Sequence, residues 1–436
     1  MKKAQDLIKT YVCGHRNPDV DTVTSAYALA ELRRLTGMQN VEAICAGRLP
    51  AKAKWVFDHF DIHEGLRPKR DVYVRVRDLL DPKLPMIESD AKLEDSLKIL
   101  ESCGESSLPV RDSKTGRFLG MLSPVKLLGL FLSKADLSIK TSEAPLASKT
   151  LVLYASDRVH DIKTSAIRNS HNHFAVVDEK GVLLGTVLKR AFAEPPPFRM
   201  ILVDHNEAAQ GIPGVEELPV IEVVDHHRIA FNPTKDPIKY TADVVGATCT
   251  LVAQMFRGSG LVPSRQTAAV LLAGIVADTL LFRSPTTTQV DRDFASWLES
   301  LCGETAENVM KGLVSVKSPL ASMPAEKAIA IDAKTYNEGG RKFVLAQIEE
   351  PHTMLFHEQI GQLKTAMDAH VNSNGIDFMA LMVTDPVRGD SELLFSGDDA
   401  VRRALPYRNG ENGTMLLPGV LSRKMQLLPE VIDALS

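Results

Sequence analysis

Four short segments rich in carboxylate and imidazole side chains each follow a mainly apolar run, and this arrangement constrains the fold more than any other feature. Apolar strands that alternate with helices indicate a parallel α/β sheet, and ligands bind at the carboxyl ends of such strands. The polar segments are 14–22, 203–207, 224–228 and 277–282, and the runs before them are Tyr11–Cys13, Met200–Val203, Val220–Val224 and Ala268–Ala277. The last run fits a buried helix equally well.

The first 60 residues predict alternating strands and helices. Tyr11–Cys13 is expected to be a strand, and a helix is expected to start at Thr22 because leucines and alanines recur at helical spacing after it. A second strand is predicted at Val41–Cys45 and a second helix at 51–60. This pattern places segment 14–22 in a loop between a strand and a helix.

Three candidate metal-binding side chains lie in that first loop. His15, Asp19 and Asp21 can converge from one turn, which Pro18 stiffens through its fixed φ. Surface loops often contain such a string, so it is weak evidence by itself. A helix-capping loop with Asp21 or Thr22 as the N-cap is the alternative interpretation.

The other three polar segments strengthen the metal hypothesis. Asp204, Asp225 and Asp278 each end an apolar run, where a charge must be paired, bound to metal or placed in a cleft. Carboxylates gathered in one crevice repel one another unless cations neutralise them. With His226 and His227 they form a mixed oxygen and nitrogen donor set, which favours Mn²⁺ or Co²⁺ over a site for Mg²⁺ alone. Two capped loops, with histidines bonded to the backbone, remain the alternative.

Residues 70–196 interrupt this pattern and contain an internal repeat. The copies at 87–123 and 153–187 both predict a strand, helix, strand, turn, strand and then a helix, with Gly116 or Gly181 in the turn. The repeat resembles a tandem pair of cystathionine-β-synthase (CBS) domains. Such a resemblance implies adenine nucleotide binding and regulation of an attached enzyme.

The repeat departs from the nucleotide-binding CBS pattern in both copies. Nucleotide-binding members have Ser or Thr followed three residues later by Asp, whereas here Lys126 follows Ser123. The second copy has Leu188 and Ala191 at the matching positions. A dimerisation module without a nucleotide is therefore the alternative to ligand binding.

Composition narrows the classes of partner and setting. The net charge of −4 gives no electrostatic footprint for duplex nucleic acid, so we expect no nucleic acid partner. No apolar run is long enough to span a bilayer, and no apolar signal region follows the basic start, so we expect no membrane association. Five scattered cysteines without a CxxC pair favour a reduced, cytoplasmic setting.

The domain organisation follows from these breaks in pattern. We expect one α/β domain from 1–69 and 197–314, interrupted by the insert at 70–196. Small and Pro-bearing residues at 315–324 predict a linker, and 325–436 predicts a smaller α/β domain. Its apolar segments are 328–334, 342–347 and 378–385.

Two motifs carry a resemblance that covers essentially the whole chain. Asp225-His226-His227 is similar to the signature of the DHH phosphoesterase superfamily, and the sequence at 422–426 resembles the SRKKQ motif, with Met425 replacing the second Lys. The chain thus resembles a family II inorganic pyrophosphatase with an inserted CBS pair, although Ala277 stands where family members usually have Ser. This resemblance implies a parallel-sheet DHH catalytic domain interrupted by the insert, then a smaller α/β DHH-associated domain.

The resemblance also implies a site and a reaction. Pyrophosphate would be hydrolysed to two phosphates by a hydroxide that bridges two Mn²⁺ or Co²⁺ ions, with Mg²⁺ on the substrate and both lobes closing over it. Family members are usually homodimers, which we expect here. The implied metal ligands are His15, Asp19, Asp21, Asp204, His226 and Asp278, with Asp225 a further candidate. The implied substrate-binding residues are His227, Lys334, Arg423 and Lys424.

Two other functions compete with pyrophosphate hydrolysis. A DHH exopolyphosphatase or short-oligonucleotide phosphodiesterase would use the same metal motifs, but the nuclease branch typically has a glycine-rich C-terminal motif. A nonenzymatic adenine-nucleotide sensor would not need the six implied ligands. Arg423 and Lys424, considered alone, would fit the solvated start of a helix.

Overall fold

The computed structural model describes residues 8–147, 151–230, 233–316, 319–350, 353–386 and 388–435. These residues form two compact units. One unit comprises the chain up to Asp71, Met200–Ile212 and the chain from Val220 onward, and the other comprises Val72–Arg199 and Pro213–Pro219. The second unit is therefore built mainly from one long insertion in the first.

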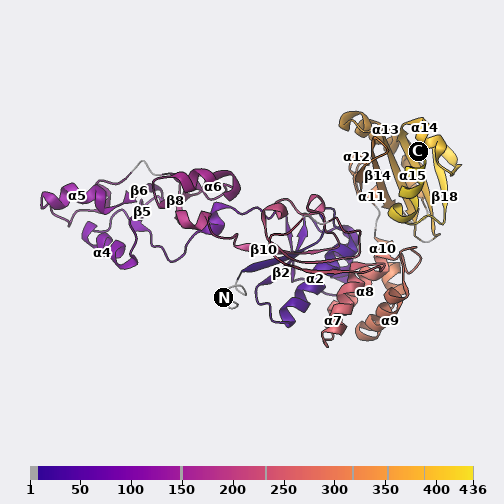
Figure 1. The fold of residues 1–436 in the computed structure, drawn as a ribbon, viewed down its shortest axis with the longest axis horizontal. Helices are drawn as coiled ribbons and strands as arrows, with labels where there is room; N and C mark the ends of the chain where they lie inside the picture. The colour runs from indigo at the N-terminus through magenta and orange to yellow at the C-terminus, as the bar shows by residue number, and fades with distance from the viewer. Residues whose placement is uncertain are drawn as a thin grey trace. The chain divides into compact units, whose positions relative to one another are not determined.

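A six-stranded sheet organises the N-terminal domain of the first unit (Figure 1). The strand order is β12-β11-β10-β1-β2-β3, and the pairs β1–β2, β2–β3, β10–β11 and β11–β12 are all parallel. The predicted parallel α/β sheet is confirmed. Its strands are β1 (Lys9–Cys13), β2 (Val41–Ala46), β3 (Leu66–Lys69), β10 (Phe198–Val203), β11 (Val220–Asp225) and β12 (Lys239–Ala242).

Helices α7, α8 and α9 lie beside one another in the same domain (Figure 1). Every residue from 267 to 276 of α8 is buried, which shows that the run before Asp278 is a buried helix rather than a strand. No helix in the described part of the chain has both the length and the apolar character that crossing a bilayer requires. The domain's helices are α2 (Val20–Leu35), α3 (Ala51–His59), α7 (Thr248–Gly258), α8 (Arg265–Asp278), α9 (Gln289–Cys302) and α10 (Ala306–Ser315).

Helix α2 begins earlier than the sequence predicted. Its first residue is Val20, and the N-cap is Asp19, whose carboxylate accepts a hydrogen bond of 2.9 Å from the Thr22 amide. The predicted start at Thr22, and the alternative of Asp21 or Thr22 as the cap, were therefore wrong. The earlier start places Asp21 in the first turn of the helix, where it is buried.

A buried ion pair joins α2 to the central sheet. The Nε atom of Arg33 donates to Glu222 on β11 at 2.7 Å, and a second nitrogen of the same guanidinium contacts the other carboxylate oxygen. The two side chains are only 9% and 2% exposed. This two-pronged contact fixes α2, which follows segment 14–22, against β11, which leads into segment 224–228.

The insert contains two similar three-stranded sheets, β4-β5-β6 and β7-β8-β9. The first copy follows the predicted order, whereas the second ends in the 3₁₀ helix η3 (Lys189–Phe192) rather than an α-helix. Gly116 and Gly181 have φ of 72° and 79°, as their predicted turn positions require. The other elements are η1 (Val76–Leu79), β4 (Ile87–Glu88), α4 (Leu93–Cys103), β5 (Leu108–Arg111), β6 (Phe118–Leu122), α5 (Pro124–Leu132), η2 (Thr141–Glu143), β7 (Val152–Tyr154), α6 (Val159–Arg168), β8 (His173–Val177) and β9 (Leu183–Leu188).

The C-terminal domain is a smaller α/β structure with a mixed six-stranded sheet in the order β13-β14-β15-β16-β18-β17. Two of its three predicted apolar segments are within strands, but 328–334 lies between a helix that ends at Ala328 and a strand that begins at Lys334. The strands are β13 (Lys334–Glu338), β14 (Arg341–Glu349), β15 (Phe378–Asp385), β16 (Asp390–Gly397), β17 (Arg408–Asn409) and β18 (Met415–Pro418). The helices are α11 (Pro319–Ser322), α12 (Ala325–Ala328), α13 (Met354–Asn374), α14 (Asp399–Ala404), η6 (Glu411–Gly413), the π-helix η7 (Arg423–Leu427) and α15 (Leu428–Asp433).

We expect Arg33→Met to lower the free energy of unfolding of the N-terminal domain by about 3–5 kcal/mol, because it leaves the Glu222 carboxylate buried without a partner. Both tryptophans, Trp55 and Trp297, are on helices of this domain, so fluorescence during urea unfolding reports on it. Lys54→Met, which breaks the exposed pair with Asp58, is the matched control and should change stability by less than about 1 kcal/mol. A loss for Arg33→Met no larger than the control's would contradict this account.

Candidate metal centre

The loop between β1 and α2 brings three predicted ligands to the carboxyl end of the sheet. His15 Nε2 lies 3.5 Å from an Asp19 oxygen and 3.4 Å from an Asp204 oxygen. Asp21 is 1% exposed in the first turn of α2, so its carboxylate is almost completely desolvated. The loop thus contributes one imidazole and two carboxylates to the same region.

Asp204 is the carboxylate that the other groups surround. It directly follows β10 and has a φ of 59°, in the left-handed region that aspartate tolerates better than most residues. Its two oxygens accept hydrogen bonds from the hydroxyls of Thr22, at 2.6 Å, and Thr248, at 3.0 Å. These bonds fix the carboxylate's orientation from two different helices.

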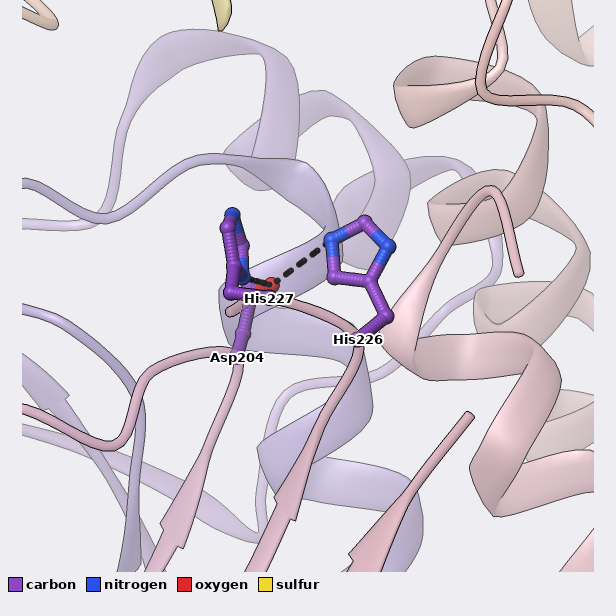
Figure 2. Close-up of side chains that lie close together, drawn as sticks. All are labelled: Asp204, His226 and His227. Atoms are coloured by element: carbon purple, nitrogen blue, oxygen red, sulfur yellow. Dashed lines mark ion pairs between the residues drawn. The ribbon is translucent and has the colours of Figure 1, made fainter. Parts of the chain in front are cut away.

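Figure 2 shows the imidazole rings of His226 and His227 beside Asp204. One nitrogen of each ring lies 3.6 Å from the same Asp204 oxygen, Oδ1. The ring centroids are 4.4 Å apart and the ring planes are inclined at 80°. His226 Nδ1 lies 3.0 Å from the Val245 carbonyl, so it donates its proton there and leaves Nε2 free to act as a ligand. His227 Nδ1 lies 2.8 Å from Asp225, which fixes that ring separately. The two adjacent histidines therefore point in different directions.

Asp278 completes the arrangement from the last residue of α8. One of its oxygens is 3.5 Å from His226 Nε2, and its side chain is 34% exposed. The next residues make an uncommon turn, because Leu280, Leu281 and Phe282 all have positive φ. This backbone strain is located beside a candidate ligand.

The seven side chains form three overlapping groups that could each hold a cation. Within each group, the candidate donor atoms lie within 4.8 Å of one another. Asp204 and His226 each belong to two groups, so the groups form one continuous centre. The groups are Asp204 with His226 and His227, His15 with Asp19 and Asp204, and Asp21 with His226 and Asp278.

The electrostatics of this cluster fit bound cations. Burial and then repulsion from Asp204 and Asp278 raise the pKa of Asp21 well above its usual range. Burial lowers the pKa of His15, but its hydrogen bonds and attraction to Asp19 and Asp204 outweigh that effect and raise the pKa to about 10. Bound cations would therefore relieve the repulsion among the carboxylates. A mixed set of oxygen and nitrogen donors suits Mn²⁺ or Co²⁺.

Several groups that support the ligands were missed by the sequence analysis. The backbone amides of Thr248 and Cys249, in the first turn of α7, donate to the two Asp21 oxygens at 2.7 and 2.9 Å. The Asn206 amide donates to Asp225 at 2.6 Å. Asn206 lies in a segment that the sequence analysis had singled out, but nothing in the sequence relates α7 to Asp21.

The C-terminal candidates share the smaller domain. Burial and repulsion from Lys334 lower the pKa of Lys424, which is expected where two cations converge on a site for an anion. Arg423 is buried, and its guanidinium donates to the backbone carbonyl and, at 3.0 Å, to the carboxylate of Asp332. Arg423 is thus already paired with Asp332, whereas Lys334 and Lys424 lie close enough to repel each other.

Comparison with known proteins places this centre in a family. The DHH family N-terminal domain matches residues 9–275 and the DHHA2 domain matches residues 311–434, so the chain belongs to the DHH family. A cobalt-dependent inorganic pyrophosphatase from Clostridium perfringens is 24% identical over 98% of both chains. The manganese-dependent inorganic pyrophosphatase of Bacillus subtilis is 34% identical over 54% of this chain and 77% of its own. Within the DHH family, the chain belongs with these inorganic pyrophosphatases.

A solved structure has the same fold along nearly the whole chain. A Methanococcus jannaschii protein assigned to the family II inorganic pyrophosphatases aligns over 98% of this chain and 99% of its own, with a TM-score of 0.60 and 20% identity. At that identity the likeness concerns the fold. It covers both domains and the insert.

We expect Asp204→Asn to weaken Mn²⁺ binding by at least about 100-fold. Asp204 belongs to two of the three groups of candidate ligands, and both groups lose its negative charge. Isothermal titration of metal-free protein with Mn²⁺ measures this directly. Asp58→Asn removes an exposed carboxylate from α3 of the same domain and should bind Mn²⁺ as the unmodified protein does. Unchanged affinity in Asp204→Asn would exclude this residue as a ligand.

Proposed function

We propose that the chain hydrolyses inorganic pyrophosphate to two phosphates in the cluster centred on Asp204. One observation carries the proposal: side chains from four separate parts of a pyrophosphatase-family chain bring their donor atoms into three overlapping groups. The reaction adds one water to the P–O–P bridge, so the bridging oxygen leaves with one phosphate and the water oxygen stays on the other. No covalent enzyme intermediate is needed.

The proposed ligands of two Mn²⁺ or Co²⁺ ions are His15, Asp19, Asp21, Asp204, His226 and Asp278, with Mg²⁺ accompanying the substrate. When bound, these ions supply Lewis-acid charge and make a water molecule acidic enough to act as a nucleophile near neutral pH. The protein's own contribution is to hold the ligands in fixed orientations. The hydrogen bonds to Asp204, Asp21 and His226 provide that rigidity.

His227 contacts the substrate in this proposal. Asp225 accepts the Nδ1 proton at 2.8 Å, which leaves Nε2 as a hydrogen-bond acceptor. Burial lowers the pKa of His227, so the ring is neutral near pH 7. A neutral ring in a fixed tautomer can accept a proton from water or from a protonated phosphate oxygen.

Lys334, Lys424 and Arg423 are proposed to bind the phosphate oxygens. The two lysines repel each other, and a phosphate between them would relieve that repulsion. Arg423 orders Asp332, two residues before Lys334, and binds phosphate if that pairing opens. Their positive charge stabilises the oxygens that gain negative charge as the bridge breaks.

Adenine nucleotides are proposed to bind the insert and to regulate hydrolysis. The two copies form one module, since Leu183 donates to the Gly116 carbonyl at 3.0 Å and His173 Nε2 lies 2.6 Å from Glu105. The CBS pairs that this insert resembles usually bind adenine nucleotides. The missing aspartates at Lys126 and Ala191 argue for testing binding directly.

A homodimer in the cytoplasm is the proposed state of the protein. Helix α5 exposes Val125, Leu128 and Leu132 at 80%, 55% and 77%, so an apolar face is available for a second copy. All five cysteines are free thiols, as a reducing compartment maintains them. Sedimentation at several concentrations tests the dimer, and a monomer throughout would contradict it.

The test of function is phosphate release from pyrophosphate with Mn²⁺ or Co²⁺ plus Mg²⁺, with and without AMP and ATP. We expect rapid turnover that falls by at least about 100-fold in Asp204→Asn, because the centre loses its shared carboxylate. A nucleotide effect would support regulation by the insert, and its absence would favour a purely structural insert. Turnover of polyphosphate or short oligonucleotides, but not of pyrophosphate, would contradict the proposed substrate.

A further inference from the structure

A fully buried carboxylate lies behind the candidate metal centre, outside the residues proposed to bind metal. Asp291 is 0% exposed in the first turn of α9. Its Oδ1 accepts a hydrogen bond from the Thr250 hydroxyl at 2.6 Å. Its Oδ2 accepts from the Gly246 amide at 2.8 Å and from both the amide and the hydroxyl of Thr288 at 2.7 Å. Four donors therefore converge on one carboxylate, and two of them, from Gly246 and Thr250, lie outside the capping box of α9.

Two of these donors belong to segment 245–250, which contacts three of the proposed ligands. The carbonyl at its start accepts the Nδ1 proton of His226 at 3.0 Å. Two amides within it donate to the oxygens of Asp21, and the hydroxyl of Thr248 donates to Asp204 at 3.0 Å. The position of this one segment thus determines the orientation of two carboxylates and one imidazole.

Gly246 allows the close approach between this segment and Asp291. A Cβ atom at this position would lie 2.9 Å from Asp291 Oδ2 and 2.6 Å from the Thr279 methyl carbon. Thr279 directly follows the proposed ligand Asp278, so the backbone that leaves this fourth ligand packs at the same point. Gly246 is therefore packed closely against both Asp291 and the residue that follows Asp278.

We propose that Asp291 is a positioning residue for the metal centre, which holds segment 245–250 and thereby presets Asp21, Asp204 and His226 for metal binding. The inference rests on the proposed function only in taking these side chains as metal ligands. A carboxylate is required because both oxygens accept hydrogen bonds. An amide would offer one oxygen and would place its own N–H groups against donors. Partners of this kind set metal affinity by fixing ligand orientation.

The test is the Mn²⁺ affinity of the full-length, metal-free protein, measured by isothermal titration. We expect Asp291→Asn to weaken Mn²⁺ binding by about tenfold or more, with the ligands themselves intact. Turnover should recover at saturating Mn²⁺, with the Mn²⁺ activation curve shifted and the KM for pyrophosphate unchanged. Thr305→Ala is the matched control, since the Thr305 hydroxyl caps the next helix, α10, but makes no contact with segment 245–250 among the described residues. It should leave Mn²⁺ affinity unchanged.

Thr250→Val keeps the inference testable if Asp291→Asn does not fold, because it removes only one hydroxyl donor from the buried carboxylate. We expect it to weaken Mn²⁺ binding by several-fold, and thermal unfolding without metal will separate this effect from lost stability. Variants that unfold more easily yet bind Mn²⁺ as the unmodified protein does would show Asp291 to be a helix cap alone. Because the readout is metal binding, it decides the role of Asp291 even if pyrophosphate proves not to be the substrate.

Discussion

Repulsion among carboxylates held at one end of a parallel sheet is the constraint on which the rest of the structure depends. Burial and then repulsion from Asp204 raise the pKa of both Asp21 and Asp278, and Asp21 and Asp204 are almost fully buried. An arrangement of this kind is stable only if positive charge or hydrogen-bond donors compensate each carboxylate. Much of the N-terminal domain can be understood as the scaffold that supplies this compensation.

The scaffold supplies it mostly through backbone amides and threonine hydroxyls rather than through fixed cations. The N-terminus of α7, where unpaired amides and the helix dipole favour an anion, is directed at Asp21. The hydroxyls of Thr22 and Thr248 donate hydrogen bonds to the Asp204 carboxylate. Neutral donors orient the carboxylates without cancelling their charge, so the centre keeps its attraction for metal ions. A lysine or arginine in these places would compete with the metal.

The sequence was most informative where a polar residue directly follows an apolar strand. Asp204 and Asp225 could be placed at the carboxyl ends of strands, because an apolar strand can be recognised from a few consecutive residues. The hydrogen bonds of Asp21 to α7 and of Asp291 to Gly246 could not be predicted, since they depend on packing between segments separated by many residues. The pairing of Arg423 with Asp332 was missed for the same reason. The run before Asp278 could not be assigned to a helix or a strand, because a continuous apolar run shows burial but not which of the two is buried.

The strand order explains why the centre forms where it does and why a long insert leaves its framework intact. The chain proceeds from β1 outward through β2 to β3, then returns beside β1 as β10 and proceeds the opposite way through β11 to β12. The order in which the strands are added reverses between β1 and β10, and the loops after these two strands carry His15 and Asp204. Such a reversal point is where ligands bind in open parallel α/β sheets. The insert occupies the connection from the edge strand β3 to β10, so the register of β10 against its neighbour β11 does not depend on its length. Loop-closure entropy grows only slowly with chain length, so this connection can carry a second folded unit while the ligands still meet.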